Sequence, residues 1–132
     1  MISKFDIINA SAGSGKTFAL TQRILVKILK SKDENYFKRI LALTFTNRAA
    51  EEMKSRILNA LKDFSNPKII GNPSVMFVQV KKELKFPSDK INRLSKERLN
   101  LLLHNYSFFQ IETLDSFNHH IIRSFSKELN LD

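Results

Sequence analysis

The sequence predicts an α/β protein in which parallel β-strands alternate with helices. Two short apolar runs, FDIINA at residues 5–10 and RILALTF at residues 39–45, suit strands buried on both faces. Each run is followed by apolar residues at helical spacing. The order strand, helix, strand, helix favours a parallel sheet whose strands are joined by helical crossovers.

The spacing of apolar residues justifies each helix in turn. From Leu20 to Leu29 this spacing predicts a helix over about residues 15–31, which ends at the polar stretch SKDEN. A second amphipathic pattern runs from Ala50 to Leu61. Two Asn-Pro pairs and a glycine within residues 65–74 then predict a turn region.

The second half of the chain is less regular. Residues 75–84, VMFVQVKKEL, fit either a strand or a helix, and residues 91–102 favour a helix that ends before Tyr106. The run FFQIET at residues 108–113 predicts a third strand. Apolar residues then recur about every four positions up to Leu129, which predicts a last helix.

Composition excludes several classes of protein. The chain has 132 residues, enough for one modest core, and it has no cysteine, which excludes disulfides and thiolate metal sites. No apolar run approaches the ~20 residues of a membrane helix, and no export leader is evident. We therefore expect a cytoplasmic protein without membrane contact. The net charge of +9, spread along the chain, favours a polyanionic partner.

The stretch ASAGSGKT fits a phosphate-binding loop between a strand and a helix, with Ala at its first position. Gly13 and Gly15 allow backbone N–H groups to turn inward, and the helix N-terminus favours an anion. Lys16 would reach the β- and γ-phosphates of ATP, and the Thr17 hydroxyl would complete a Mg²⁺ shell. These two are the candidate catalytic residues. The candidate nucleotide-binding residues are Ala10, Ser11, Ala12, Gly13, Ser14, Gly15, Lys16 and Thr17.

The stretch LALTFTNRAAEEMKSRI, residues 41–57, resembles motif Ia of superfamily 1 DNA helicases of the UvrD/Rep type. The resemblance implies a P-loop NTPase (RecA-like) parallel sheet with flanking helices, and an ATP-dependent DNA helicase. It also implies DNA contacts, from Phe45, Thr46, Asn47 and Arg48. The residues alone leave another interpretation open, in which Phe45 is a core side chain and Arg48 is simply solvated.

A third stretch, IETLDSFNHHIIRSF at residues 111–125, resembles the next DNA-contacting segment of that family and adds Thr113 and Ser116 as candidate contacts. Asp115 stands where many relatives carry His, so no phosphate contact is transferred to it. Either Thr113 or Asp115 could instead cap the last helix. His119 and His120 lack ligand spacing and are expected at the surface.

Two features suggest a branch of the family and a partial domain. Only nine residues precede Ala10, so we expect no adenine-contacting glutamine segment. This short N-terminal segment and the TLDSF stretch together resemble the RecB/AddA-type exonuclease-helicase subunits.

The acidic D-E-x-Q-D motif of such motors does not occur in residues 1–132. We therefore expect residues 1–132 to be the N-terminal part of a motor domain in a longer helicase chain. Its partners would be single- or double-stranded DNA and a nuclease subunit.

Two alternatives from other classes explain less of the sequence. A stand-alone P-loop kinase of a small metabolite leaves residues 44–56 unexplained. A non-catalytic DNA-binding module leaves the phosphate loop unexplained.

Overall fold

The computed structural model describes residues 6–9 and 14–129. Its three strands, β1 (Asp6–Asn9), β2 (Ile40–Thr44) and β3 (Gln110–Thr113), form one parallel sheet in the order β1-β2-β3. The helices are α1 (Ser14–Lys30), α2 (Asn47–Ser65), α3 (Val75–Leu84), α4 (Ser88–His104) and α5 (Leu114–Glu128). Short 3₁₀ turns lie at Tyr36–Arg39, Pro67–Ile69 and Tyr106–Phe108. The predicted α/β class is confirmed.

One row of side chains across the sheet explains why these short apolar runs are strands. Ile8 is the register partner of Ala42, which in turn is the partner of Ile111. All three are at most 1% exposed. Because alternate strand residues point to the same face, this row fixes which face of the sheet meets the helices.

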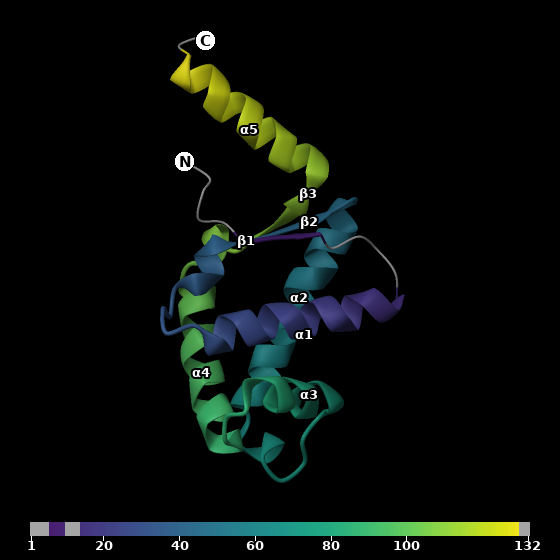
Figure 1. The fold of residues 1–132 in the computed structure, drawn as a ribbon, viewed down its shortest axis with the longest axis vertical. Coiled ribbons are helices and arrows are strands. Elements are labelled where there is room, and N and C mark those ends of the chain that lie inside the picture. Colours follow the sequence, from purple (N-terminus) through teal and green to yellow (C-terminus); the bar gives the residue numbers. More distant parts are fainter. Residues whose placement is uncertain (1–5, 10–13, 130–132) are drawn as a thin grey trace.

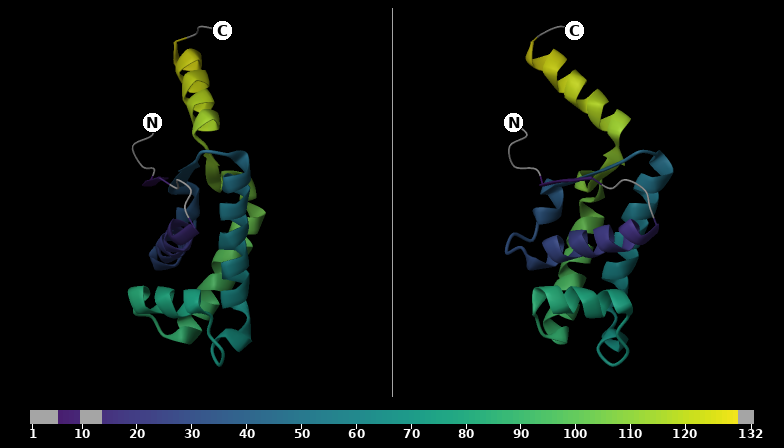
Figure 2. Two further views of the ribbon diagram at one scale, coloured as in Figure 1. Left: turned by 90° about the vertical axis from the view of Figure 1, so that its right-hand side faces the viewer. Right: turned by 45° about the vertical axis from the view of Figure 1, so that its right-hand side comes forward.

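In the part of the chain that the structure describes, four helices lie on one side of the sheet. Figures 1 and 2 show α1, α2 and α4 below the strands, with α3 on the far side of α1 from the sheet. The buried rings of Phe64 on α2 and Phe77 on α3 meet edge-to-face, with centroids 5.1 Å apart. The Asn92 side chain of α4 donates to the carbonyl oxygens of Phe64 (2.8 Å) and Asn66 (3.2 Å), which satisfies the end of α2.

The other face of the sheet is only partly covered within residues 6–9 and 14–129. Helix α5 leaves the sheet and projects away from the rest of the molecule (Figure 1), and none of its residues is buried. Its apolar residues Ile122 and Phe125 are 63% and 60% exposed, and Ile7 of β1 is 54% exposed. Isolated exposed apolar residues are common in proteins, but an apolar helix stripe beside an open sheet face is not.

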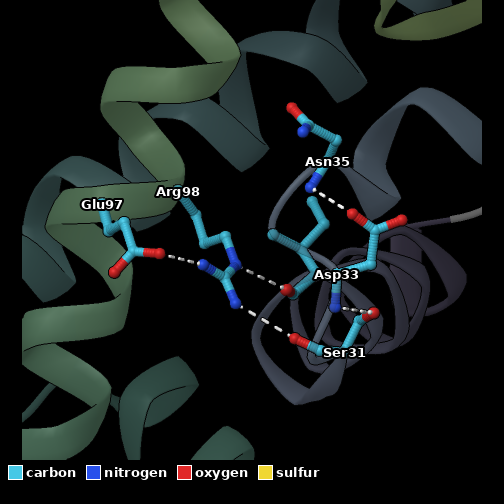
Figure 3. A network of polar contacts seen from close by, with 6 residues as sticks. Ser31, Asp33, Asn35, Glu97 and Arg98 are labelled. Carbon is cyan, nitrogen blue, oxygen red and sulfur yellow. Dashed lines mark hydrogen bonds and ion pairs between the residues drawn. The ribbon is translucent and has the colours of Figure 1, made fainter.

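A buried arginine holds α4 against the end of α1 (Figure 3). Arg98 is 4% exposed, and its guanidinium donates to the carbonyl oxygens of Ile28 (3.3 Å) and Ser31 (3.0 Å). Glu97 accepts from the same guanidinium at 2.6 Å. The last carbonyls of a helix have no partner within the helix, so Arg98 supplies donors at the point where α1 lacks them.

The segment after α1 is ordered by its own polar residues. The Ser31 hydroxyl accepts from the Asp33 N–H (3.1 Å), and Asp33 Oδ1 accepts from the Asn35 N–H (3.0 Å). The side-chain hydrogen bond from Arg39, and then the Asn35 N–H, lower the pKa of the Asp33 carboxyl. No helix in the described part of the chain is long and apolar enough to cross a membrane.

Two predicted elements are refined by the structure. Residues 75–84, which fit either a strand or a helix, form α3. The predicted strand at residues 108–113 begins only at Gln110. The reason is local: the N–H groups of Phe108 and Phe109 bond to the carbonyl oxygens of Asn105 and Tyr106 in a 3₁₀ turn, so they are not available to the sheet.

Candidate nucleotide and DNA site

Three helices begin at one edge of the sheet. Because the strands are parallel, their carboxyl ends share an edge, on the right in Figure 1. Helices α2 and α5 begin within three residues of the ends of β2 and β3, and α1 begins at Ser14, soon after β1 ends at Asn9. Ligands of open α/β sheets bind at this edge, where helix N-termini present unpaired N–H groups.

The predicted phosphate loop is described only in part. Ala10, Ser11, Ala12 and Gly13 lie outside the described residues, and Ser14, Gly15 and Lys16 form the first turn of α1. Thr17 is half-buried. The first turn of this 17-residue helix contains no acidic residue, so nothing there opposes an anion at its positive end. These features fit a phosphate group.

A buried threonine ties the loop-bearing helix to its neighbour. Thr21 Oγ1 donates to the carbonyl oxygen of Thr17 (2.8 Å) and lies 3.7 Å from Met53 Sδ on α2. Thr21 is 3% exposed. The helix that follows the phosphate loop therefore packs directly on the helix that carries the motif Ia residues.

The motif Ia side chains are accessible. Phe45 is 67% exposed, so the interpretation of this ring as a core residue is wrong. The side chain of Arg48 is 90% exposed and forms an ion pair with Glu52 (3.3 Å), one turn further along α2. Such an exposed pair is weak, and the guanidinium can exchange Glu52 for another anion at little cost. Asn47, also exposed, is the first residue of α2.

Two threonines position this loop, and the sequence interpretation missed both roles. Thr46 is the N-cap of α2, and its hydroxyl accepts from the Ala49 N–H at 3.0 Å. Buried Thr44 donates to the carbonyl oxygen of Thr46 (3.0 Å) and lies 3.4 Å from that of Glu112 on β3. A threonine just before an amphipathic run is a readable cap signal. The bridge from Thr44 requires the strand register.

Phe45 also forms one wall of a shallow hollow on the open face of the sheet. The cavity measures about 270 Å³, and its lining is mostly apolar. Its other lining residues are Ile7, Leu43, Thr44 and Leu114. A flat apolar group could lie here against the Phe45 ring.

The third predicted segment is built around a helix cap. Thr113, not Asp115, caps α5: its hydroxyl accepts from the Ser116 N–H (3.2 Å) and lies 3.0 Å from Ser116 Oγ. His119 and His120 are exposed, as expected, and His120 Nδ1 lies 3.3 Å from Glu112 Oε2. The hydroxyls of Thr113 and Ser116, the two candidate DNA contacts of this segment, are thus hydrogen-bonded to each other.

A metal ion would have few protein ligands here. Within residues 6–9 and 14–129, no group of His, Asp and Glu side chains could hold a metal by itself. Mg²⁺ commonly keeps several waters and binds through substrate phosphates with one or two protein oxygens. A single threonine hydroxyl at the start of α1 is compatible with that mode of binding.

Comparison with known proteins decides the family. The family described as UvrD/REP helicase N-terminal domain matches residues 3–132. The chain belongs to this family. The resemblance seen in motif Ia therefore extends over nearly all of the sequence, and the three-stranded parallel sheet agrees with part of a RecA-like P-loop domain.

Individual relatives of this UvrD/REP chain share one description, as a subunit of an ATP-dependent helicase/nuclease. The protein from Bacillus cytotoxicus is 34% identical over 126 residues, and that from Lactococcus lactis subsp. cremoris is 30% identical over 126 residues; each alignment covers 96% of this chain. The protein from Exiguobacterium sibiricum is 32% identical over 76% of it. The expected exonuclease-helicase branch is confirmed.

The UvrD/REP chain spans only about 8% of the length of each of these relatives. No solved structure gives a significant match.

Proposed function

We propose that this chain is the ATP- and DNA-binding N-terminal part of an ATP-dependent DNA helicase or translocase of the exonuclease-helicase type. The observation that carries the proposal is the family match over residues 3–132, combined with three helix N-termini at one sheet edge. The match argues against the metabolite-kinase alternative, because it covers residues 44–56, which that alternative did not explain. A cytoplasmic role in DNA recombination and repair, beside a second subunit, is consistent with the description of the relatives as one subunit of a helicase/nuclease.

In this proposal the start of α1 holds the nucleotide. The loop from Ala10 to Gly15 would hold the phosphates of ATP through its backbone N–H groups, and Lys16 would neutralise the β- and γ-phosphates. The Thr17 hydroxyl would be one ligand of Mg²⁺. Bound ATP supplies the free energy of hydrolysis that drives movement on DNA. The contact between Thr21 and Met53 links this helix to the DNA-binding segment on α2.

The first prediction concerns nucleotide binding. The chain should bind ATP or ADP with a Kd between about 1 μM and 1 mM, because only part of a nucleotide site is present. Lys16→Ala should remove most of the binding heat in titration calorimetry. Lys27→Ala, at the opposite end of α1, is the matched control and should bind as the wild type does. Equal binding by wild type and Lys16→Ala would place the nucleotide elsewhere.

DNA lies along the same edge in this proposal. The exposed Phe45 ring stacks on a base beside the apolar hollow, and Asn47 and Arg48 hold phosphate at the N-terminus of α2, whose first turn has no acidic residue. Thr46 contributes to DNA binding indirectly, because its hydroxyl caps α2 and so positions the backbone of Asn47 and Arg48. Ser116, in the first turn of α5, extends the DNA path across the edge, and Thr113, which is 7% exposed, positions it as the cap of that helix.

The second prediction separates stacking from charge. Phe45→Ala should weaken binding of a single-stranded oligonucleotide by roughly 1–3 kcal/mol with an unchanged salt dependence. Arg48→Ala should weaken binding equally on every sequence and lower the salt slope by about one contact. Fluorescence anisotropy over a salt series measures both. Because Phe45 is exposed, both variants should unfold like the wild type, and a destabilised Phe45→Ala protein would argue for a structural role.

The open sheet face supports the proposal of a larger motor domain. In the described part of the chain no residue of α5 is buried, and Ile7 of β1 is 54% exposed. We propose that further parts of the longer helicase chain pack on α5 and on the rest of this face outside the Phe45 hollow, as both faces of a parallel sheet are normally covered.

A further inference from the structure

A second hollow lies at the other end of the molecule, between α3 and the start of α4. Figures 1 and 2 place α3 on the far side of α1 from the sheet edge. The cavity measures about 590 Å³ and is mainly apolar, with Ile70, Val78 and Phe86 among its lining residues. No described residue of the phosphate loop or of motif Ia lines it, and residues 65–105 have no assigned role in the proposed function.

Three lysines line this hollow: Lys81, Lys82 and Lys85. All three are exposed, and none forms an ion pair with a carboxylate in the described part of the chain. Glu83 of the same helix accepts instead from Gln22 of α1 at 3.3 Å. Asp89, in the first turn of α4, does not line the hollow. The hollow therefore combines an apolar floor with a positively charged rim.

Lys85 occupies a backbone conformation that disfavours a side chain. Its φ of 59° and ψ of 32° are left-handed, and no other non-glycine residue in the described part of the chain has a positive φ. Its N–H closes α3 by bonding to the Lys81 carbonyl oxygen at 2.8 Å. Glycine is the usual residue at such a helix end because it has no Cβ. A lysine is held there at a conformational cost, and its side chain lines the hollow. This indicates that the side chain has a binding role.

We propose that this hollow docks an acidic, amphipathic peptide segment of another polypeptide. Carboxylates of the segment pair with Lys81, Lys82 and Lys85, and an apolar side chain fills the floor beside Val78 and Phe86. A nucleic-acid backbone would also be attracted to the lysines, but its sugars and phosphates are polar and lack the large apolar side chain that the floor accommodates. The proposal is independent of nucleotide or DNA binding at the sheet edge.

The test uses the full chain and a fluorescein-labelled peptide with glutamates on one helical face and leucines and a phenylalanine on the other. Anisotropy should show saturable binding that weakens as salt rises. Two control peptides, one with lysines for the glutamates and one with serines for the apolar residues, should bind much more weakly. Equal binding of either control peptide would overturn the proposal.

The variants assign the binding to the hollow. Lys85→Gly should unfold at the same or a higher temperature, because it relieves the left-handed backbone, yet bind the peptide about two- to fivefold more weakly. Lys81→Glu combined with Lys82→Glu should weaken binding by more than about tenfold. Val78→Ser should weaken it without changing the salt dependence. Arg93→Glu combined with Lys96→Glu, both exposed on α4 and outside the hollow, changes the net charge by the same amount and should leave binding unchanged.

Two results would overturn the proposal. One is peptide binding that is insensitive to the Lys81, Lys82 and Lys85 variants. The other is a single-stranded oligonucleotide that loses its binding in the Lys81→Glu and Lys82→Glu double variant and keeps it in Arg48→Ala. That pattern would make the hollow a nucleic-acid site.

Discussion

The purified 132-residue chain should turn over ATP at least about a thousandfold more slowly than a typical enzyme at ~10 per second, with or without DNA. The start of α1 is suited to binding the phosphates of ATP in the ground state. Hydrolysis requires groups that act in the transition state: a carboxylate beside the attacking water and cations around the γ-phosphate.

The described carboxylates near the sheet edge are poorly placed for that task. Glu52 pairs with Arg48, and Glu51 lies 3.5 Å from Lys54 on its own helix. Glu112 faces His120 of α5 from the far strand of the sheet. Asp115 is exposed in the first turn of α5, two residues beyond the cap of a helix that projects away from α1.

A coupled assay of phosphate release, with Lys16→Ala as the contamination control, measures this turnover. Activity of several per second that disappears in Lys16→Ala would mean that the chain contains its own catalytic acid. Glu112→Gln and Asp115→Asn would then identify which carboxylate is responsible.

The largest loss of stability from a single polar residue should come from Arg98→Ala. The substitution removes donors from the Ile28 and Ser31 carbonyl oxygens and leaves a void between α4 and α1. Two charged hydrogen bonds from a buried guanidinium predict a loss of about 3 kcal/mol in the free energy of unfolding. The melting temperature should fall by about 10 °C.

Urea unfolding followed by circular dichroism measures the effect. Arg93→Ala, exposed on the same helix, should change the free energy of unfolding by no more than about 0.5 kcal/mol. Arg98→Lys should fall between the two, because one ammonium group cannot serve both carbonyls in the geometry of a guanidinium. If Arg98→Ala unfolds like Arg93→Ala, the hydrogen bonds to α1 contribute nothing.

Sequence predicts well those elements whose apolar residues follow a clear strand or helix spacing. β1, β2, α1 and α2 follow from apolar runs and helical spacing alone. Residues 75–84 are ambiguous because β-branched and aromatic residues mix with lysines. The deciding signal lies in Ser74, whose hydroxyl accepts from the Phe77 N–H at 3.2 Å, and in the spacing of buried Phe77, Val80 and Leu84.

The features that sequence could not supply depend on tertiary approach. An arginine in the middle of an amphipathic helix is usually solvated, and Arg98 is buried only because α4 passes the end of α1. The periodicity of α5 predicts an apolar stripe but not what that stripe faces. At the candidate site, Phe45 could be placed after a strand from sequence, whereas its exposure and the bridge from Thr44 to Glu112 depend on the register of β2 and β3.

The order of the strands has a consequence for synthesis on the ribosome. Neighbours in the sheet are also neighbours in sequence, β1 beside β2 and β2 beside β3, so each strand finds its partner already made when it emerges. Parallel sheets usually fold slowly because distant segments must meet. Here the sheet can grow in the order of translation, within the roughly ten seconds that a ribosome needs for a chain of this length. A nascent chain stalled after β2 has emerged from the ribosome should therefore already protect the backbone amides that join β1 to β2 from hydrogen exchange.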